Sequence, residues 1–119
     1  MTSLPLPRQA AAAAAALLSR NAAACREGAE LIKALAHPLR LRIAARLCAG
    51  PATVSELAGE LGVAQAVISQ QLSVLRARGL VGLARTGERG PYRLLERRVR
   101  TMVNCLHGCI QERTRKGHP

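Results

Sequence analysis

The chain has 119 residues, which is enough for one compact domain. Eighteen lysines and arginines against seven acidic residues give a formal net charge of +11, which favours a polyanionic partner: nucleic acid first, then an anionic membrane surface or an acidic protein. Tyr92 is the single aromatic residue, so the aromatic stacking that usually binds single-stranded nucleic acid is excluded.

Residues 1–21 are predicted to form a flexible or frayed N-terminal arm, because two prolines precede a low-complexity alanine run. Arg8, this run and the small residues before Cys25 loosely resemble a signal peptide with a lipoprotein-like cysteine. Alanine in place of leucine and the arginine-rich sequence that follows argue against that alternative. No stretch approaches the ~20 apolar residues of a membrane span. We therefore expect a cytoplasmic protein without membrane contact.

Residues 22–113 are predicted to form the folded domain, and residues 114–119 a basic tail. Apolar residues spaced by three and four predict a helix over residues 22–36, and Pro38 suits the first position of the next helix, which ends at Gly50.

Thr53 and Glu56 have the spacing of a capping box, so a short helix begins there and ends at Gly62. A longer helix over residues 64–78 follows this glycine turn and ends at Gly79.

Two short strands, residues 80–85 and 91–95, are predicted to form a hairpin with a charged tip. The last helix, residues 96–113, carries a seam for helix packing, made of Leu95, Val99, Met102, Leu106, Cys109 and Arg113. One short chain offers little to cover this seam, so we expect a two-fold dimer formed by the N- and C-terminal helices. The expected fold is mainly α with a small β-hairpin wing, a winged helix-turn-helix.

The helix after the turn is predicted to enter the major groove of double-stranded DNA. Its polar side chains Gln65, Ser69, Gln70 and Gln71 suit base edges and phosphates, with Arg76 and Arg78 on the flanking backbone. At the wing tip, Arg85 and Arg89 suit phosphates or the minor groove. Any one of these side chains can instead simply be solvated, but together they predict strongly salt-dependent binding.

Four segments make residues 30–110 resemble the ArsR/SmtB family of bacterial winged-helix repressors: Leu35–Ile43, Thr53–Ala58, Ile68–Leu75 and Gly79–Val81. The resemblance implies a homodimer that occupies a palindromic operator and leaves it when an inducer binds, commonly a metal, a metalloid or a sulfur oxidant. Gln71 stands where the family often has histidine. The Cys-Val-Cys arsenic signature before the recognition helix is absent, as is the Asp and His pattern of zinc sites on the last helix.

Cys105 and Cys109 are the candidate inducer thiols, because residues four apart share one face of a helix. Arsenite, antimonite or another soft ion would accept them, with Cys25 or Cys48 as a third ligand, and no cofactor is otherwise required. This segment also resembles the cysteine-bearing tail of some arsenite-responsive family members. Tetrahedral zinc is a weaker option, because His107 points away from the shared face.

Four other interpretations stay open. A redox or reactive-sulfur sensor would use two thiols that can be oxidised and re-reduced. Alternatively, the cysteines are only small buried apolar residues, as isolated cysteines usually are. A thiol oxidoreductase and a basic adaptor protein are alternatives of other classes. We expect no enzyme, since the sequence has no Ser/His/Asp arrangement, phosphate-binding glycine loop or paired acidic residues.

Overall fold

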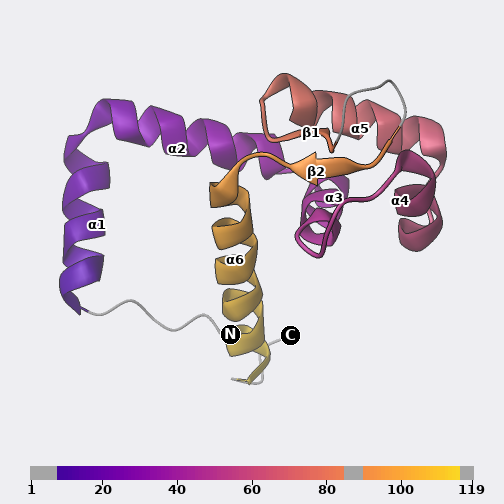
Figure 1. The fold of residues 1–119 in the computed structure, drawn as a ribbon. Coiled ribbons are helices and arrows are strands. Elements are labelled where there is room, and N and C mark those ends of the chain that lie inside the picture. Colours follow the sequence, from indigo (N-terminus) through magenta and orange to yellow (C-terminus); the bar gives the residue numbers. More distant parts are fainter. Residues whose placement is uncertain (1–7, 85–89, 116–119) are drawn as a thin grey trace. The chain divides into compact units, whose positions relative to one another are not determined.

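The computed structural model describes residues 8–84 and 90–115, and Figure 1 shows their fold. Two compact units are present: residues 34–103, and the N-terminal residues up to Lys33 together with the C-terminal residues from Asn104. The expected mainly α architecture with one hairpin is confirmed. The elements in chain order are α1 (Arg8–Arg20), α2 (Ala22–Leu35), α3 (Pro38–Leu47), α4 (Val54–Leu61), α5 (Gln65–Ala77), β1 (Val81–Leu83), β2 (Tyr92–Leu94) and α6 (Arg97–Arg115).

The unit of residues 34–103 is built around an aliphatic core. Helix α5 packs on both α3 and α4, and the hairpin packs on α3 and α5. The largest fully buried side chains are Ile43, Leu47, Leu57, Ile68, Leu72, Leu75, Val81 and Val99. They come from each of α3, α4, α5, β1 and α6, so one apolar core fixes the first turns of α6 together with the helix-turn-helix.

The hairpin is antiparallel, with Val81 opposite Leu94 and Leu83 opposite Tyr92. It is attached to the segment before α4, because Ala52 and Tyr92 exchange backbone hydrogen bonds of 3.0 and 2.7 Å. This bridge holds the base of the wing beside the helix-turn-helix. The sequence alone did not predict it.

Local capping signals set the helix ends close to where they were expected. His37 caps α3 by accepting a hydrogen bond from the Leu39 amide at 3.1 Å, with Pro38 in the first turn. The predicted capping box of Thr53 and Glu56 begins α4 with both reciprocal bonds formed. The strands are shorter than expected, and α6 runs two residues beyond the predicted end at Arg113.

The other unit contains α1, most of α2 and the second half of α6. Helix α1 covers Arg8–Arg20 of the expected N-terminal arm, and the Asn21 side chain caps α2 by accepting from the Ala24 amide at 3.0 Å. This unit holds five of the seven large apolar side chains that are exposed in the described residues, namely Leu17, Leu18, Ile32, Leu106 and Ile110. None of the helices within residues 8–84 and 90–115 combines the length and the apolar character that a membrane span requires.

Candidate nucleic-acid interface

The turn between α4 and α5 depends on Gly62. This residue has φ 69°, a left-handed conformation in which a Cβ would be strained, and it ends α4 as predicted. The backbone amides of Gly62 and Val63 both donate to the Ala58 carbonyl, at 2.9 and 3.1 Å. The chain therefore turns within three residues, and α5 begins at Gln65 without a side-chain cap.

Helix α5 has one buried face and one exposed face. Ile68, Leu72 and Leu75 are fully buried against the core. Gln65, Ser69, Gln70 and Arg76 are exposed, so four of the predicted DNA-contacting side chains lie on the solvent side of the helix. Their polar groups are therefore accessible to a partner such as the major groove of duplex DNA, which is wide enough to admit a helix.

Gln71 lies differently from its neighbours. Its side chain is half-buried, and its Oε1 accepts a hydrogen bond from Nη1 of Arg40 on α3 at 3.1 Å. The Nε of Arg40 also donates to the Ala34 carbonyl at 2.6 Å. One guanidinium therefore connects the end of α2 with the helix that carries the candidate DNA contacts.

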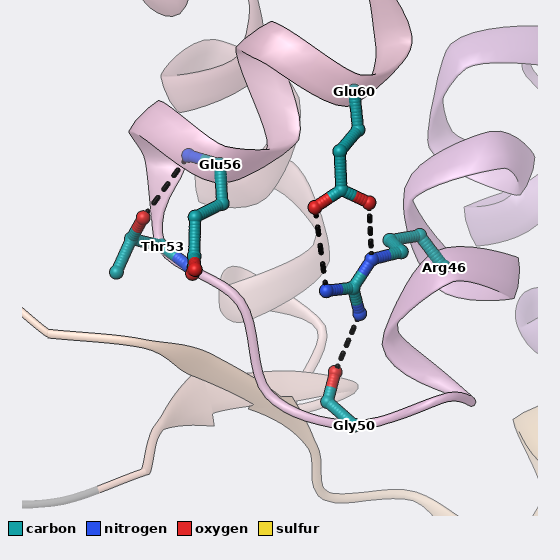
Figure 2. Close-up of polar contacts among 5 residues, drawn as sticks. All are labelled: Arg46, Gly50, Thr53, Glu56 and Glu60. Carbon is teal, nitrogen blue, oxygen red and sulfur yellow. Dashed lines mark hydrogen bonds and ion pairs between the residues drawn. The ribbon is translucent and has the colours of Figure 1, made fainter.

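Two further arginines of α3 hold α4 in place, and Figure 2 shows the contacts of one of them, Arg46. Arg46 Nε donates to Glu60 Oε1 at 2.6 Å, and Arg46 Nη1 donates to the Gly50 carbonyl at 3.0 Å. Arg42 Nη2 donates to the Leu61 carbonyl at the end of α4 at 3.0 Å. Sequence reasoning missed these roles, because no local spacing marks partners that lie 14 and 19 residues apart.

The expected wing contacts Arg85 and Arg89 lie outside the described residues. Sequence reasoning did not single out Arg93, which the structure places in β2 with an exposed side chain. Its position in the hairpin makes it an additional candidate for a phosphate contact. The signal was present in the sequence as an arginine within the second predicted strand.

All four cysteines are thiols outside disulfides. Cys105 and Cys109 are exposed and lie one helical turn apart on α6, while the exposed Cys25 donates to the Leu18 carbonyl. Cys48 is half-buried in the unit of residues 34–103, where burial raises the pKa of its thiol although the Arg100 charge acts in the opposite direction. Residues 8–84 and 90–115 contain no group of three or more His, Cys, Asp or Glu that could hold a metal ion.

The chain is similar to known regulatory proteins over most of its length. Residues 37–82, which contain the helix-turn-helix, match the family described as bacterial regulatory protein, arsR family. The biofilm growth-associated repressor of Xylella fastidiosa is 40% identical over 89 residues, which are 73% of this chain and 78% of that protein.

Two solved structures extend the likeness. The structure of AntR, described as an antimony-specific transcriptional repressor, superposes with a TM-score of 0.75 at 27% identity, over 95% of this chain and 99% of that one. The homodimeric winged helix-turn-helix DNA-binding domain of Mb0332 from Mycobacterium bovis has a TM-score of 0.64 at 30% identity, over 83% of this chain and 91% of that one. The winged helix-turn-helix expected from the sequence is thus confirmed.

Proposed function

Because this chain belongs to the arsR family of bacterial regulatory proteins, DNA-binding transcriptional regulators of the ArsR/SmtB type, we propose that it is a homodimeric repressor that a soft, thiol-binding ion releases from a palindromic operator. The observation that carries the DNA-binding part is the two-faced helix α5. Its apolar face is fixed in the core, and Gln65, Ser69 and Gln70 are exposed directly after the turn. Two such helices, related by a two-fold axis, would read two half-sites of one duplex in the cytoplasm.

The exposed apolar side chains of α1, α2 and α6 support the dimer. Leu106 and Ile110 lie one turn apart on α6 and are 39% and 57% exposed, and three more apolar side chains are exposed on α1 and α2. Exposed apolar side chains on the N- and C-terminal helices favour association with a second copy of the chain. Val99, which the sequence placed on the same seam, is instead fully buried in the chain's own core, so only the later turns of α6 are left for a partner.

The inducer part rests on Cys105 and Cys109. Both thiols are exposed on one face of α6, and thiolates are the ligands that arsenite, antimonite and other soft ions prefer. AntR, described as antimony-specific, supports a metalloid over a hard ion. Release by a factor of about 100 in operator affinity requires a coupling of only about 2.7 kcal/mol between the thiols and the DNA-binding surface.

The DNA-binding proposal is tested by selecting a duplex from a random-sequence pool with the purified full chain. We expect a two-fold symmetric sequence that binds at least about 1,000-fold more tightly than a random duplex at 150 mM salt. Equal affinity for both duplexes would indicate a basic adaptor and contradict the proposal.

Sedimentation of the purified chain tests the dimer. The Leu106→Glu, Ile110→Glu double variant should yield monomers, whereas Gln111→Glu, at an exposed position on the same helix, should not.

The inducer proposal is tested by titrating arsenite, antimonite, zinc and polysulfide into the complex with the selected duplex. Arsenite or antimonite should release wild-type protein but not the Cys105→Ser, Cys109→Ser double variant, which should still bind DNA. Gln111→Ser, an exposed polar position on the same helix, is the control for a substitution on α6, and Cys25→Ser tests Cys25 as the third ligand. Release by polysulfide alone would assign a redox mechanism in place of metalloid binding.

A further inference from the structure

Arg40 links two acceptors that belong to different helices. Its Nε donates to the Ala34 carbonyl at 2.6 Å, and its Nη1 donates to Gln71 Oε1 at 3.1 Å. Ala34 is the penultimate residue of α2, so its carbonyl belongs to the last turn, where no intrahelical amide is available. Because a guanidinium is planar and its donors are fixed relative to one another, the two bonds hold the end of α2 and the Gln71 side chain in one arrangement.

The chemistry of arginine also decides which way the Gln71 amide faces. A guanidinium has donors and no acceptor, so only the oxygen of Gln71 can face it. The amide nitrogen therefore points away from Arg40. Gln71 is half-buried and lies between the buried Leu72 and the exposed Gln70, at the border of the exposed face of α5.

We propose that Arg40 is a positioning residue for DNA recognition, which holds the Gln71 carbonyl toward the protein so that Gln71 presents only N–H donors to a hydrogen-bond acceptor on DNA. This inference rests on the proposed function. The two-bond contact of a glutamine with adenine needs the amide oxygen as acceptor and the amide nitrogen as donor at the same time. With its oxygen held by Arg40, Gln71 instead donates to an acceptor, either on a base edge or on a phosphate.

The test uses the full chain, the selected duplex and a random duplex of equal length, with affinities measured over a range of salt concentrations. Arg40→Lys keeps the positive charge but cannot reproduce the fork that bridges two acceptors. We expect this variant to lose about tenfold in affinity for the selected duplex with unchanged salt dependence, and to lose affinity for the random duplex only if Gln71 donates to a phosphate. Arg42→Lys is the matched control, because Arg42 lies on the same helix and donates to the Leu61 carbonyl instead, and it should keep the wild-type preference.

A double-variant cycle tests whether Arg40 acts through Gln71. Gln71→Ala should also cost about tenfold for the selected duplex, and the Arg40→Lys, Gln71→Ala protein should be no weaker than Gln71→Ala alone. If the double variant instead loses about a hundredfold in affinity, which is the product of the two single losses, the two residues act independently and the proposal is overturned. The proposal is also overturned if Arg40→Met lowers the affinity for both duplexes and reduces the slope of log affinity against log salt concentration by about one. Arg40 would then contact a phosphate itself.

The acceptor is identified from the Gln71→Ala protein. A loss confined to the selected duplex assigns a base edge, and an equal loss for both duplexes assigns a phosphate oxygen. No loss for either duplex would overturn the proposal. If the wild-type chain selects no duplex, the proposed function itself fails, an outcome distinct from a normal selection followed by independent effects of Arg40 and Gln71.

Discussion

Arg46 and Glu60 form the ion pair that joins α3 to α4, with Arg46 Nε 2.6 Å from Glu60 Oε1. The same guanidinium also donates to the Gly50 carbonyl, so it fixes the start of the loop that leads into α4 (Figure 2). The side chains are 26% and 49% exposed, which places the pair at the surface.

We predict that Glu60→Gln lowers the free energy of unfolding by less than about 1 kcal/mol, because water screens exposed ion pairs. Urea denaturation at low and high salt measures the effect, and the difference from wild type should shrink at 1 M salt. A loss above about 3 kcal/mol, or one insensitive to salt, would show that the pair acts as a buried one.

The capping box of α4 should carry a measurable share of stability. Thr53 Oγ1 accepts from the Glu56 amide at 3.0 Å, and the Glu56 carboxylate accepts from the Thr53 amide at 2.8 Å. Thr53→Ala removes the first bond and should cost about 1 kcal/mol in thermal or urea unfolding. Thr53→Ser keeps the hydroxyl and should recover most of the loss. Equal stabilities of the alanine and serine variants would exclude the hydroxyl as the cause.

The acid dependence of stability should include a contribution from Glu96. Hydrogen bonds from the side chain and the backbone amide of Arg98 lower the pKa of Glu96 from 4.5 to about 2. Because the pKa of Glu96 is lower in the folded chain than in the unfolded chain, the unfolded chain binds more protons between about pH 2 and 4.5. The stabilisation is therefore complete above about pH 4.5 and is lost as the pH falls toward 2.

Glu96→Gln should accordingly be less stable than wild type at pH 7, and the difference should decrease between pH 4.5 and 2. Urea unfolding measured at several pH values gives this difference in the free energy of unfolding. The contributions of the other carboxylates cancel in it because both proteins contain them. A difference that stays constant over the whole range would mean that the Glu96 charge is not what the Arg98 contacts stabilise.

The two glycines of α4 and its turn should respond oppositely to alanine. Gly62 has φ 69°, so Gly62→Ala should destabilise the protein by about 1 to 2 kcal/mol and weaken binding to the selected duplex. Gly59 lies inside α4 with nothing within 4 Å of an added Cβ, so Gly59→Ala should stabilise it by about 0.5 to 1 kcal/mol. Thermal unfolding of both variants compares them directly, and a stabilised Gly62→Ala would be inconsistent with the left-handed turn.

The helix ends of the candidate site were predictable because their signals are local. The Thr53 and Glu56 spacing, the glycine at position 62 and Pro38 each act within four residues, so sequence alone placed the turn before α5. The apolar period of α5 likewise predicted Ile68, Leu72 and Leu75 as its buried face. Gln65, Ser69 and Gln70 were then expected on the exposed face, where the structure has them.

The sequence by itself determined the order of the elements, their caps, the two faces of α5 and the likeness to a family, because periodicity and short-range hydrogen bonds follow from neighbouring residues. Only the tertiary structure decided that Val99 belongs to the chain's own core, that Ala52 pairs with Tyr92, and that Arg40 holds Gln71 across 31 positions. Such contacts depend on how whole helices pack, which brings together residues that no local pattern relates.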